Sequence, residues 1–213
     1  MRTRKLAAAM VWMVAVTLPG LGQSGPAATT RRMGISARVA VDVYLSDRDD
    51  FARLLGSGKL VASGIFKKIG VCLNWHTGEL PAGQSGFVIR TVENAPESAA
   101  SVALASTELA GSSVVEITVY EDRVRRFLDA HPSLTGVATA YVLAHELAHA
   151  MQGVARHSES GILKAQWSNY DCEEMVFHTL AFTPSDVELI HRGLALQLAK
   201  RRSGQAAEVE SGT

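Results

Sequence analysis

The segment His145-Glu-Leu-Ala-His149 places two histidines and a glutamate at a spacing suited to metal chemistry. Because residues four apart share one face of an α-helix, the two imidazoles could bind the same tetrahedral zinc ion. Glu146 would lie beside them, roughly 100° around the helix axis. From there its carboxylate could take a proton from a water molecule whose pKa zinc has lowered to about 7. The pattern predicts metal-assisted hydrolysis of an amide bond, with Glu146 as the general base.

The residues around this segment have the pattern of a buried helix. Ser133 is the predicted N-cap, and Gly153 follows at a position where a left-handed residue often ends a helix. Apolar side chains surround the polar ones, at Val142, Leu143, Leu147, Ala148 and Met151. A surface helix with solvated histidines is the simpler interpretation. The coincidence of metal-ligand spacing with a buried pattern favours a zinc site instead.

A zinc site needs a third protein ligand, and His157 is the first candidate. It follows His149 by eight residues, just after Gly153, where the chain could reverse toward the metal. Turn-forming residues then lead to the apolar pair 162–163, which would form a floor below the metal. Carboxylates on a later helix can also complete a zinc site. The competing candidates are therefore Asp171, Glu173 and Glu174.

The arrangement resembles the metzincin clan of zinc peptidases, whose pattern is HExxHxxGxxH followed by a turn with Met below the zinc. This chain has HELAHAMQGVARH and then SGIL. Its glycine comes one residue late, its third histidine two residues late, and Leu163 stands at the place of the turn Met. The chain is also similar to small secreted bacterial zincin-like proteins with an HExxHxxxGxxxH segment. Residues 142–167 carry the specific part of a likeness that spans about 38–195.

This resemblance implies an α+β, zincin-like fold, with a mixed, mainly parallel sheet packed against helices. It implies an exported zinc-dependent peptidase, an endopeptidase rather than an exopeptidase, acting on a peptide or protein. His145, His149 and His157 would hold Zn²⁺. Residues 102–106 would form an edge strand beside the substrate, and Tyr170 could assist at the metal. The alternative is a zinc-binding module of the same fold without peptidase activity, but the presence of Glu146 favours catalysis.

Apolar periodicity predicts the elements that must position these residues. Val-rich, alternating segments predict strands at 38–45, 71–75, 86–92, 102–105 and 114–120. Helices are expected at 51–69, with a possible break at 56–58, at 121–130, from 133 to 152, and at 185–201. Ser185 and Glu188 would form the capping box of the last helix. A helix between the first two strands makes a βαβ unit, which favours parallel pairing.

The N-terminal residues predict export. Basic residues precede an apolar run from Leu6 to Leu18 that is too short for a comfortable membrane span, which is typical of a signal peptide over 1–22. A flexible lead is expected at 23–37, a catalytic domain at 38–202 and a disordered tail at 203–213. The protein would then be secreted or periplasmic.

The composition fits one globular domain, with 47% hydrophobic and 20% charged residues. Twenty-one basic residues balance twenty-one acidic ones, so there is no electrostatic basis for a nucleic-acid or membrane-surface partner. We expect a monomer without stable membrane association after signal cleavage. Cys72 and Cys172 could form a disulfide in an exported chain or remain two buried thiols, and the sequence leaves both possibilities open.

Overall fold

The computed structural model describes residues 39–45, 50–100, 103–108 and 114–211, all within one compact unit that spans 35–213. The predicted signal peptide at 1–22 and the lead at 23–37 lie outside the described residues. No helix of the described part is long and apolar enough to cross a membrane. Cys72 and Cys172 are both free thiols.

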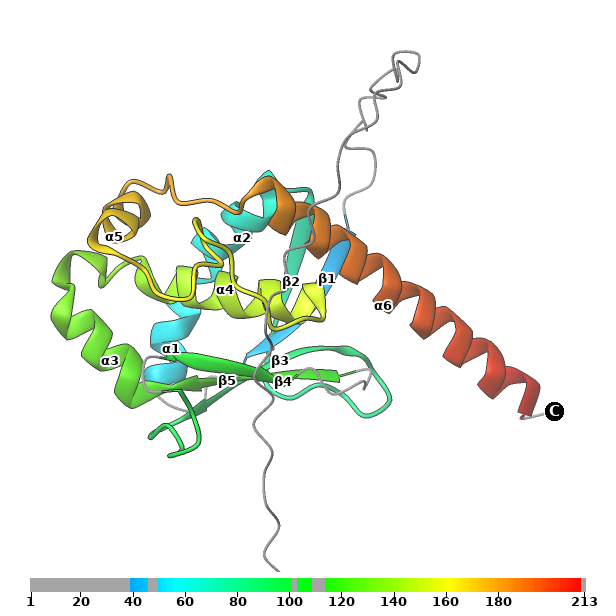
Figure 1. Ribbon diagram of the computed structural model, residues 1–213. Helices are drawn as coiled ribbons and strands as arrows, with labels where there is room; N and C mark the ends of the chain where they lie inside the picture. The colour runs from blue at the N-terminus through cyan, green and yellow to red at the C-terminus, as the bar shows by residue number, and fades with distance from the viewer. Residues whose placement is uncertain (1–38, 46–49, 101–102, 109–113, 212–213) are drawn as a thin grey trace, which may run out of the picture. The chain divides into compact units, whose positions relative to one another are not determined.

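A five-stranded mixed sheet forms one layer of the unit, with the strand order β2-β1-β3-β5-β4 (Figure 1). The strands are β1 (Val39–Leu45), β2 (Val71–Thr77), β3 (Gly86–Val92), β4 (Ala105–Glu108) and β5 (Val114–Tyr120). The pairs β1–β2, β1–β3 and β3–β5 are parallel, whereas β4 pairs with β5 in the antiparallel direction. The predicted mixed, mainly parallel sheet is confirmed.

The odd-numbered side chains of the strands face the helices. In β1 these are Val41, Val43 and Leu45, which belong to the buried core together with Ile117 and Val119 of β5. Because side chains alternate along a strand, Thr107 of β4 points to the same side. A polar side chain at this position therefore reaches into the helical layer.

The described residues also form six α-helices. They are α1 (Asp50–Ser57), α2 (Lys59–Lys68), α3 (Glu121–Ala130), α4 (Ala138–Gln152), α5 (Asn169–Val176) and α6 (Pro184–Ser211). The predicted break between the first two helices is confirmed at Gly58. A Cβ atom there would lie 2.6 Å from the backbone nitrogen of Ala140. Because glycine has no side chain, the backbone of α4 can pack directly against Gly58.

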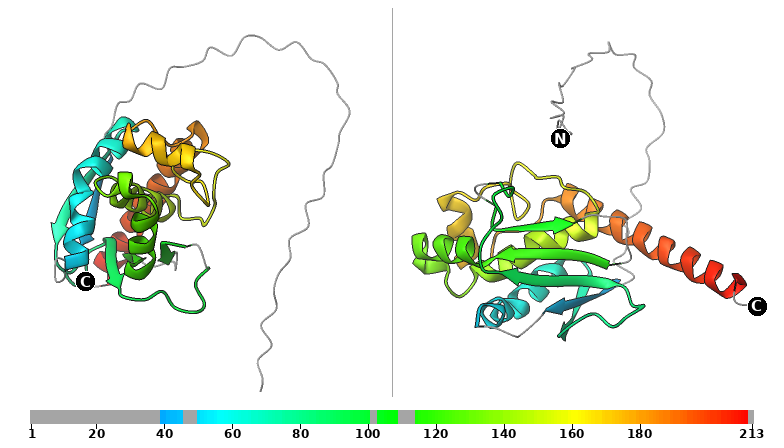
Figure 2. Two further views of the ribbon diagram at one scale, coloured as in Figure 1. Left: turned by 90° about the vertical axis from the view of Figure 1, so that its left-hand side faces the viewer. Right: turned by 90° about the horizontal axis from the view of Figure 1, so that it is seen from below.

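The helix α4 carries the HExxH segment through the centre of the unit and contacts α1, α2, α6, β4 and β5 (Figures 1 and 2). Gly153 ends it in the left-handed conformation with φ 69°, as predicted. The predicted N-cap was wrong. Pro132 starts a separate 3₁₀ turn over Pro132–Leu134, so Ser133 lies within that turn and α4 begins later, at Ala138.

The other differences concern α5 and α6. Trp167 leads into α5, which begins with a capping box between Ser168 and Asp171. The α6 helix begins at Pro184 and is capped by Thr183 and Asp186 rather than by Ser185 and Glu188. Proline suits the first helical position because its fixed φ is already helical and its missing N–H needs no partner.

The α6 helix also continues to Ser211, past residue 202, where the catalytic domain was predicted to end (Figure 2). The sequence predicted a disordered tail from 203. Extending a helix that has already formed costs far less than starting a new one, and the alanine, glutamine and glutamate residues of this segment are good helix formers.

Candidate metal centre

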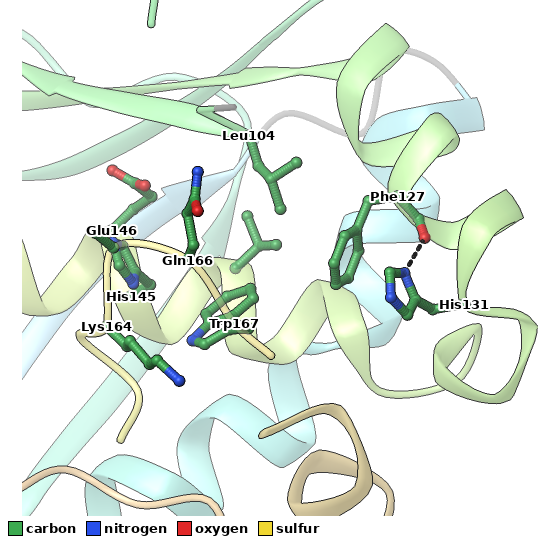
Figure 3. Close-up of a pocket in the computed structure, with 10 residues that line it drawn as sticks. Leu104, Phe127, His131, His145, Glu146, Lys164, Gln166 and Trp167 are labelled. Atoms are coloured by element: carbon green, nitrogen blue, oxygen red, sulfur yellow. Dashed lines mark hydrogen bonds between the residues drawn. The ribbon is translucent and has the colours of Figure 1, made fainter. Parts of the chain in front are cut away.

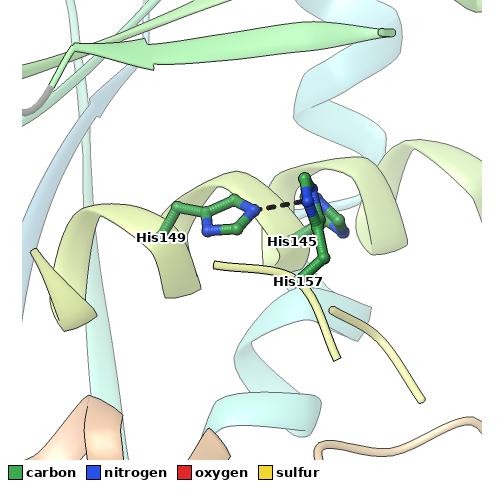
Figure 4. A group of neighbouring side chains, drawn as sticks. All are labelled: His145, His149 and His157. Atoms are coloured by element: carbon green, nitrogen blue, oxygen red, sulfur yellow. Dashed lines mark hydrogen bonds between the residues drawn. The ribbon is translucent and has the colours of Figure 1, made fainter. Parts of the chain in front are cut away.

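Three histidines meet at the C-terminal half of α4 (Figure 4). His145 and His149 come from the helix, and His157 comes from the loop that follows Gly153. Each ring offers one nitrogen to a metal, and these three nitrogens lie within 4.8 Å of one another. This arrangement could hold a metal ion. No other such cluster of histidine, cysteine and carboxylate groups occurs in the described part of the chain.

The hydrogen bonds of two rings indicate which nitrogen is free for a metal. Nδ1 of His145 lies 2.8 Å from the carbonyl oxygen of Ile162, and Nδ1 of His149 lies 3.4 Å from that of Val154. Because a carbonyl only accepts hydrogen bonds, each Nδ1 carries the proton and each Nε2 keeps its lone pair. Backbone carbonyls orient metal-bound histidines in the same way.

The two Nε2 atoms of His145 and His149 then face each other at 3.1 Å (Figure 4). Two lone pairs at this distance repel unless a cation lies between them. Two nitrogens at 2.0–2.1 Å from a common tetrahedral zinc ion are about 3.3 Å apart, close to the observed separation. The donor set therefore fits a zinc ion.

Burial also favours the metal-binding form of these rings. Removal from water lowers the pKa of His145 to about 4 and that of His149 to about 4, and the mutual effect of the histidine charges acts in the same direction. Both imidazoles are neutral at pH 7 as a result. Neutral imidazole is the form that binds metal ions.

Glu146 lies next to the histidines and is 8% exposed. Its Oε2 accepts a hydrogen bond of 2.7 Å from the hydroxyl of Thr107 in β4. Burial raises the pKa of Glu146, whereas the Thr107 hydroxyl and the histidine charges act against this rise. A raised pKa brings a carboxylate closer to the value that suits a general base near neutral pH.

Sequence reasoning missed Thr107. Residues 102–106 were the predicted edge strand, and β4 overlaps this range only at 105–106 because it begins later; residue 102 lies outside the described part. Alternation from Ala105 would have placed Thr107 on the buried face. Its partner is thirty-nine residues away and could not be identified from spacing.

A pocket of about 280 Å³ opens beside Glu146 and His145 (Figure 3). Leu104 and Trp167 face it from opposite sides, and Phe127 lies at the end away from Glu146. The remaining lining residues are His131, Val142, Lys164, Ala165 and Gln166. The pocket can take a large apolar group next to the candidate metal centre.

Trp167 links this pocket to the histidines. Its indole Nε1 donates to the Ile162 carbonyl at 3.2 Å, the same oxygen that accepts from His145. The Trp167 ring meets the His145 ring edge-on at 5.6 Å between centroids. Ile162 and Leu163, the predicted apolar floor, are both fully buried.

The competing candidates lie elsewhere. Asp171 caps α5 and pairs with Lys164 at 2.6 Å, and it does not belong to the histidine cluster. Glu173 and Glu174, also on α5, are not part of that cluster either. Tyr170 is 67% exposed and does not line the pocket. Of the predicted site residues, the structure brings together His145, Glu146, His149 and His157.

Comparisons with known proteins add little to this description. No protein-family model matches the chain, and no curated protein matches it. Among solved structures, the crystal structure of archaemetzincin from Methanopyrus kandleri is similar, with a TM-score of 0.44 and 17% sequence identity. The similarity covers 76% of this chain and 98% of that one. A likeness at this TM-score does not establish an activity, so the function has to be inferred from the site itself.

Proposed function

We propose that this protein is a zinc-dependent peptidase with a zincin-like fold. The observation that carries the proposal is that the Nε2 atoms of His145 and His149 face each other, with His157 and a buried glutamate beside them. Zinc held by these three rings would supply a Lewis acid that polarises a carbonyl group and acidifies a water molecule.

Glu146 would move the proton in this reaction. Its carboxylate is buried next to the metal centre and is held by Thr107, so it is oriented before substrate binds. It would take a proton from the attacking water and later give it to the departing amine. Its raised pKa suits both steps, since the same group must accept and then release the proton.

The surroundings of the centre suit an extended peptide. β4 ends the sheet, and within the described residues it pairs on one side only, with β5. A substrate could add to its other side as a further strand. Leu104, just before this strand, lines the apolar pocket, which could receive a side chain next to the scissile bond. Binding along a strand and not at a chain end favours an endopeptidase.

The proposed setting is outside the cytoplasm, in the periplasm or the medium. Its basis is the charged and then apolar pattern of residues 1–22. Fractionation of cells that express the full chain, with N-terminal sequencing of the product, tests this part separately from the chemistry. An unprocessed protein found only in the cytoplasm would contradict it.

The test of activity uses the zinc-loaded protein and an unfolded protein substrate. We expect cleavage that a chelator abolishes and zinc restores. Glu146→Gln should keep the zinc and lose the cleavage, because the carboxylate is a base and not a ligand. A Glu146→Gln variant as active as the parent would contradict the mechanism. Zinc binding without any cleavage by the parent protein would favour the non-catalytic module instead.

A further inference from the structure

The third histidine is held differently from the first two. His145 and His149 lie on a rigid helix, and each Nδ1 faces a backbone carbonyl. His157 is exposed, lies in a loop, and its ring has no hydrogen-bond partner among the described residues. Its position at the centre must therefore come from the loop backbone on either side of it.

Asp186, at the start of α6, binds both residues that flank His157. Its Oδ1 lies 3.0 Å from Nη1 of Arg156 and also accepts a hydrogen bond from the Ser158 hydroxyl. Arg156 and Ser158 contact each other as well, at 3.2 Å between Nη1 and Oγ. One carboxylate oxygen thus gathers the two neighbours of the third histidine.

The other oxygen of Asp186 caps α6. Its Oδ2 accepts from the backbone nitrogen of Thr183 at 3.0 Å and from the Thr183 hydroxyl at 2.7 Å. The cap uses only this oxygen. The Oδ1 contacts are additional to the cap, and they are all directed to the loop.

The Asp186 carboxylate is fully buried, whereas the Arg156 side chain is 41% exposed. Burying an ionised carboxylate is costly unless several donors compensate for the lost water. Burial alone would raise the pKa of Asp186, but the hydrogen bonds from Ser158, Thr183 and Arg156 outweigh it and hold the pKa below its usual value. The carboxylate is therefore charged at neutral pH and binds its donors strongly.

Backbone contacts also hold the loop that follows His157. The backbone nitrogen of Ser158 donates to the carbonyl of Leu163 at 2.8 Å, which closes the loop on itself. Gly161, with φ 78°, lies so close to the Ala181 carbonyl that a Cβ atom would come within 2.4 Å of it. The loop is thus fixed near Gly161 by backbone packing against Ala181. Beside His157 it is held by the Ser158–Leu163 backbone bond and by the side-chain contacts of Asp186.

We propose that Asp186 is a positioning residue for the metal centre: by holding Arg156 and Ser158 on one oxygen, it sets His157 in place as the third ligand. The inference rests on the metal site of the proposed function and does not depend on peptide hydrolysis. It assigns to α6, which supplies no ligand, a part in metal affinity that acts through His157.

The experiment is a double-mutant cycle on the zinc affinity of the full-length protein, measured by competition with a chelator. Asp186→Asn should weaken zinc binding about 10- to 100-fold, the range found when groups behind metal ligands are changed. In the His157→Ala background the same substitution should cause no further loss, because Asp186 acts through His157. An equal loss in both backgrounds would indicate general loosening or a long-range charge effect, and would overturn the proposal.

Two matched variants separate the loop from the cap. Ser158→Ala removes a donor on the loop side and should weaken zinc binding. Thr183→Val removes the hydroxyl on the cap side and should lower the melting temperature while zinc affinity stays unchanged. If Asp186→Asn does not fold, the Ser158→Ala and Thr183→Val pair decides the question, and equal zinc affinity in both overturns the proposal. A protein that binds zinc as described but cleaves nothing would contradict the proposed peptidase activity and leave this inference standing.

Discussion

Thr107 of the edge strand donates a 2.7 Å hydrogen bond to the Oε2 atom of Glu146 on α4, and this bond ties the sheet to the candidate general base. The hydroxyl occupies a strand position whose neighbours on the same face are apolar and buried. Among the described residues it is the side-chain hydrogen bond that the Glu146 carboxylate accepts, so it orients the carboxylate. The strand proposed to bind substrate thus also orients the base.

We expect Thr107→Val to lower turnover about tenfold or more, because a hydrogen bond to a charged group contributes about 1.5–3 kcal/mol. The substrate concentration for half-maximal rate should change little. Steady-state cleavage of a fluorogenic peptide measures both quantities. Thr107→Ser keeps the hydroxyl and should restore most of the rate, with the zinc content equal in all three proteins. A Thr107→Ser variant as slow as Thr107→Val would contradict the prediction, because serine keeps the hydroxyl that donates to Glu146.

Zinc content should identify the third ligand. His157→Ala is expected to lower zinc affinity strongly, because two ligands from one helix hold zinc only weakly. Metal analysis after dialysis against a weak chelator measures this. Glu173→Ala and Glu174→Ala serve as controls on α5. Both variants should keep about one zinc ion per chain. Loss of zinc in either control, with zinc retained in His157→Ala, would move the third ligand to α5.

Asp171 should make stability depend on acid pH. Burial alone would raise its pKa, but hydrogen bonds from Lys164 and Ser168 outweigh that and hold the pKa below its usual value. Its stabilising effect is therefore full above the unfolded pKa, roughly 3.9, and is lost as the pH falls through the folded pKa. Asp171→Asn should lower the free energy of unfolding by about 1–3 kcal/mol at pH 7.

Urea denaturation at several pH values measures this prediction. The difference between Asp171→Asn and the parent protein should shrink as the pH falls below roughly 3.9, because the parent carboxyl is then protonated as well. Glu173→Gln, an exposed change on the same helix, is the matched control and should show neither effect. A difference that stays constant down to the acid limit would mean that the carboxylate charge plays no part.

Two glycines should respond in opposite ways to alanine. A Cβ atom at Gly193 of α6 would lie 2.1 Å from the carbonyl oxygen of Met151, at the C-terminal end of α4, so Gly193→Ala must push the two helices apart. We expect a loss of stability of about 1–3 kcal/mol. Gly64, in the exposed face of α2, has nothing within 4 Å, so Gly64→Ala should stabilise by up to about 1 kcal/mol. Thermal unfolding compares them, and equal melting temperatures would refute the close packing of α4 and α6.

The features of the site that depend on local spacing could be predicted from the order of residues. Helix geometry puts His145 and His149 on one face wherever the helix lies, and Gly153 ends that helix because the left-handed conformation suits glycine. Val-rich alternation likewise predicted the strands β1, β3 and β5 close to their observed limits. These features follow from bonds and side-chain preferences within a few residues, so they could be read directly from the chain.

Which distant groups meet depends instead on how the whole chain packs. Thr107 reaches Glu146 because β4 lies over α4, Ile162 turns its carbonyl to His145, and Asp186 reaches the residues beside His157. Each contact joins segments whose separation depends on the path of the whole chain. Hydrophobic packing sets that path, and because packing is not directional, no local spacing in the sequence specifies which polar groups it will bring together.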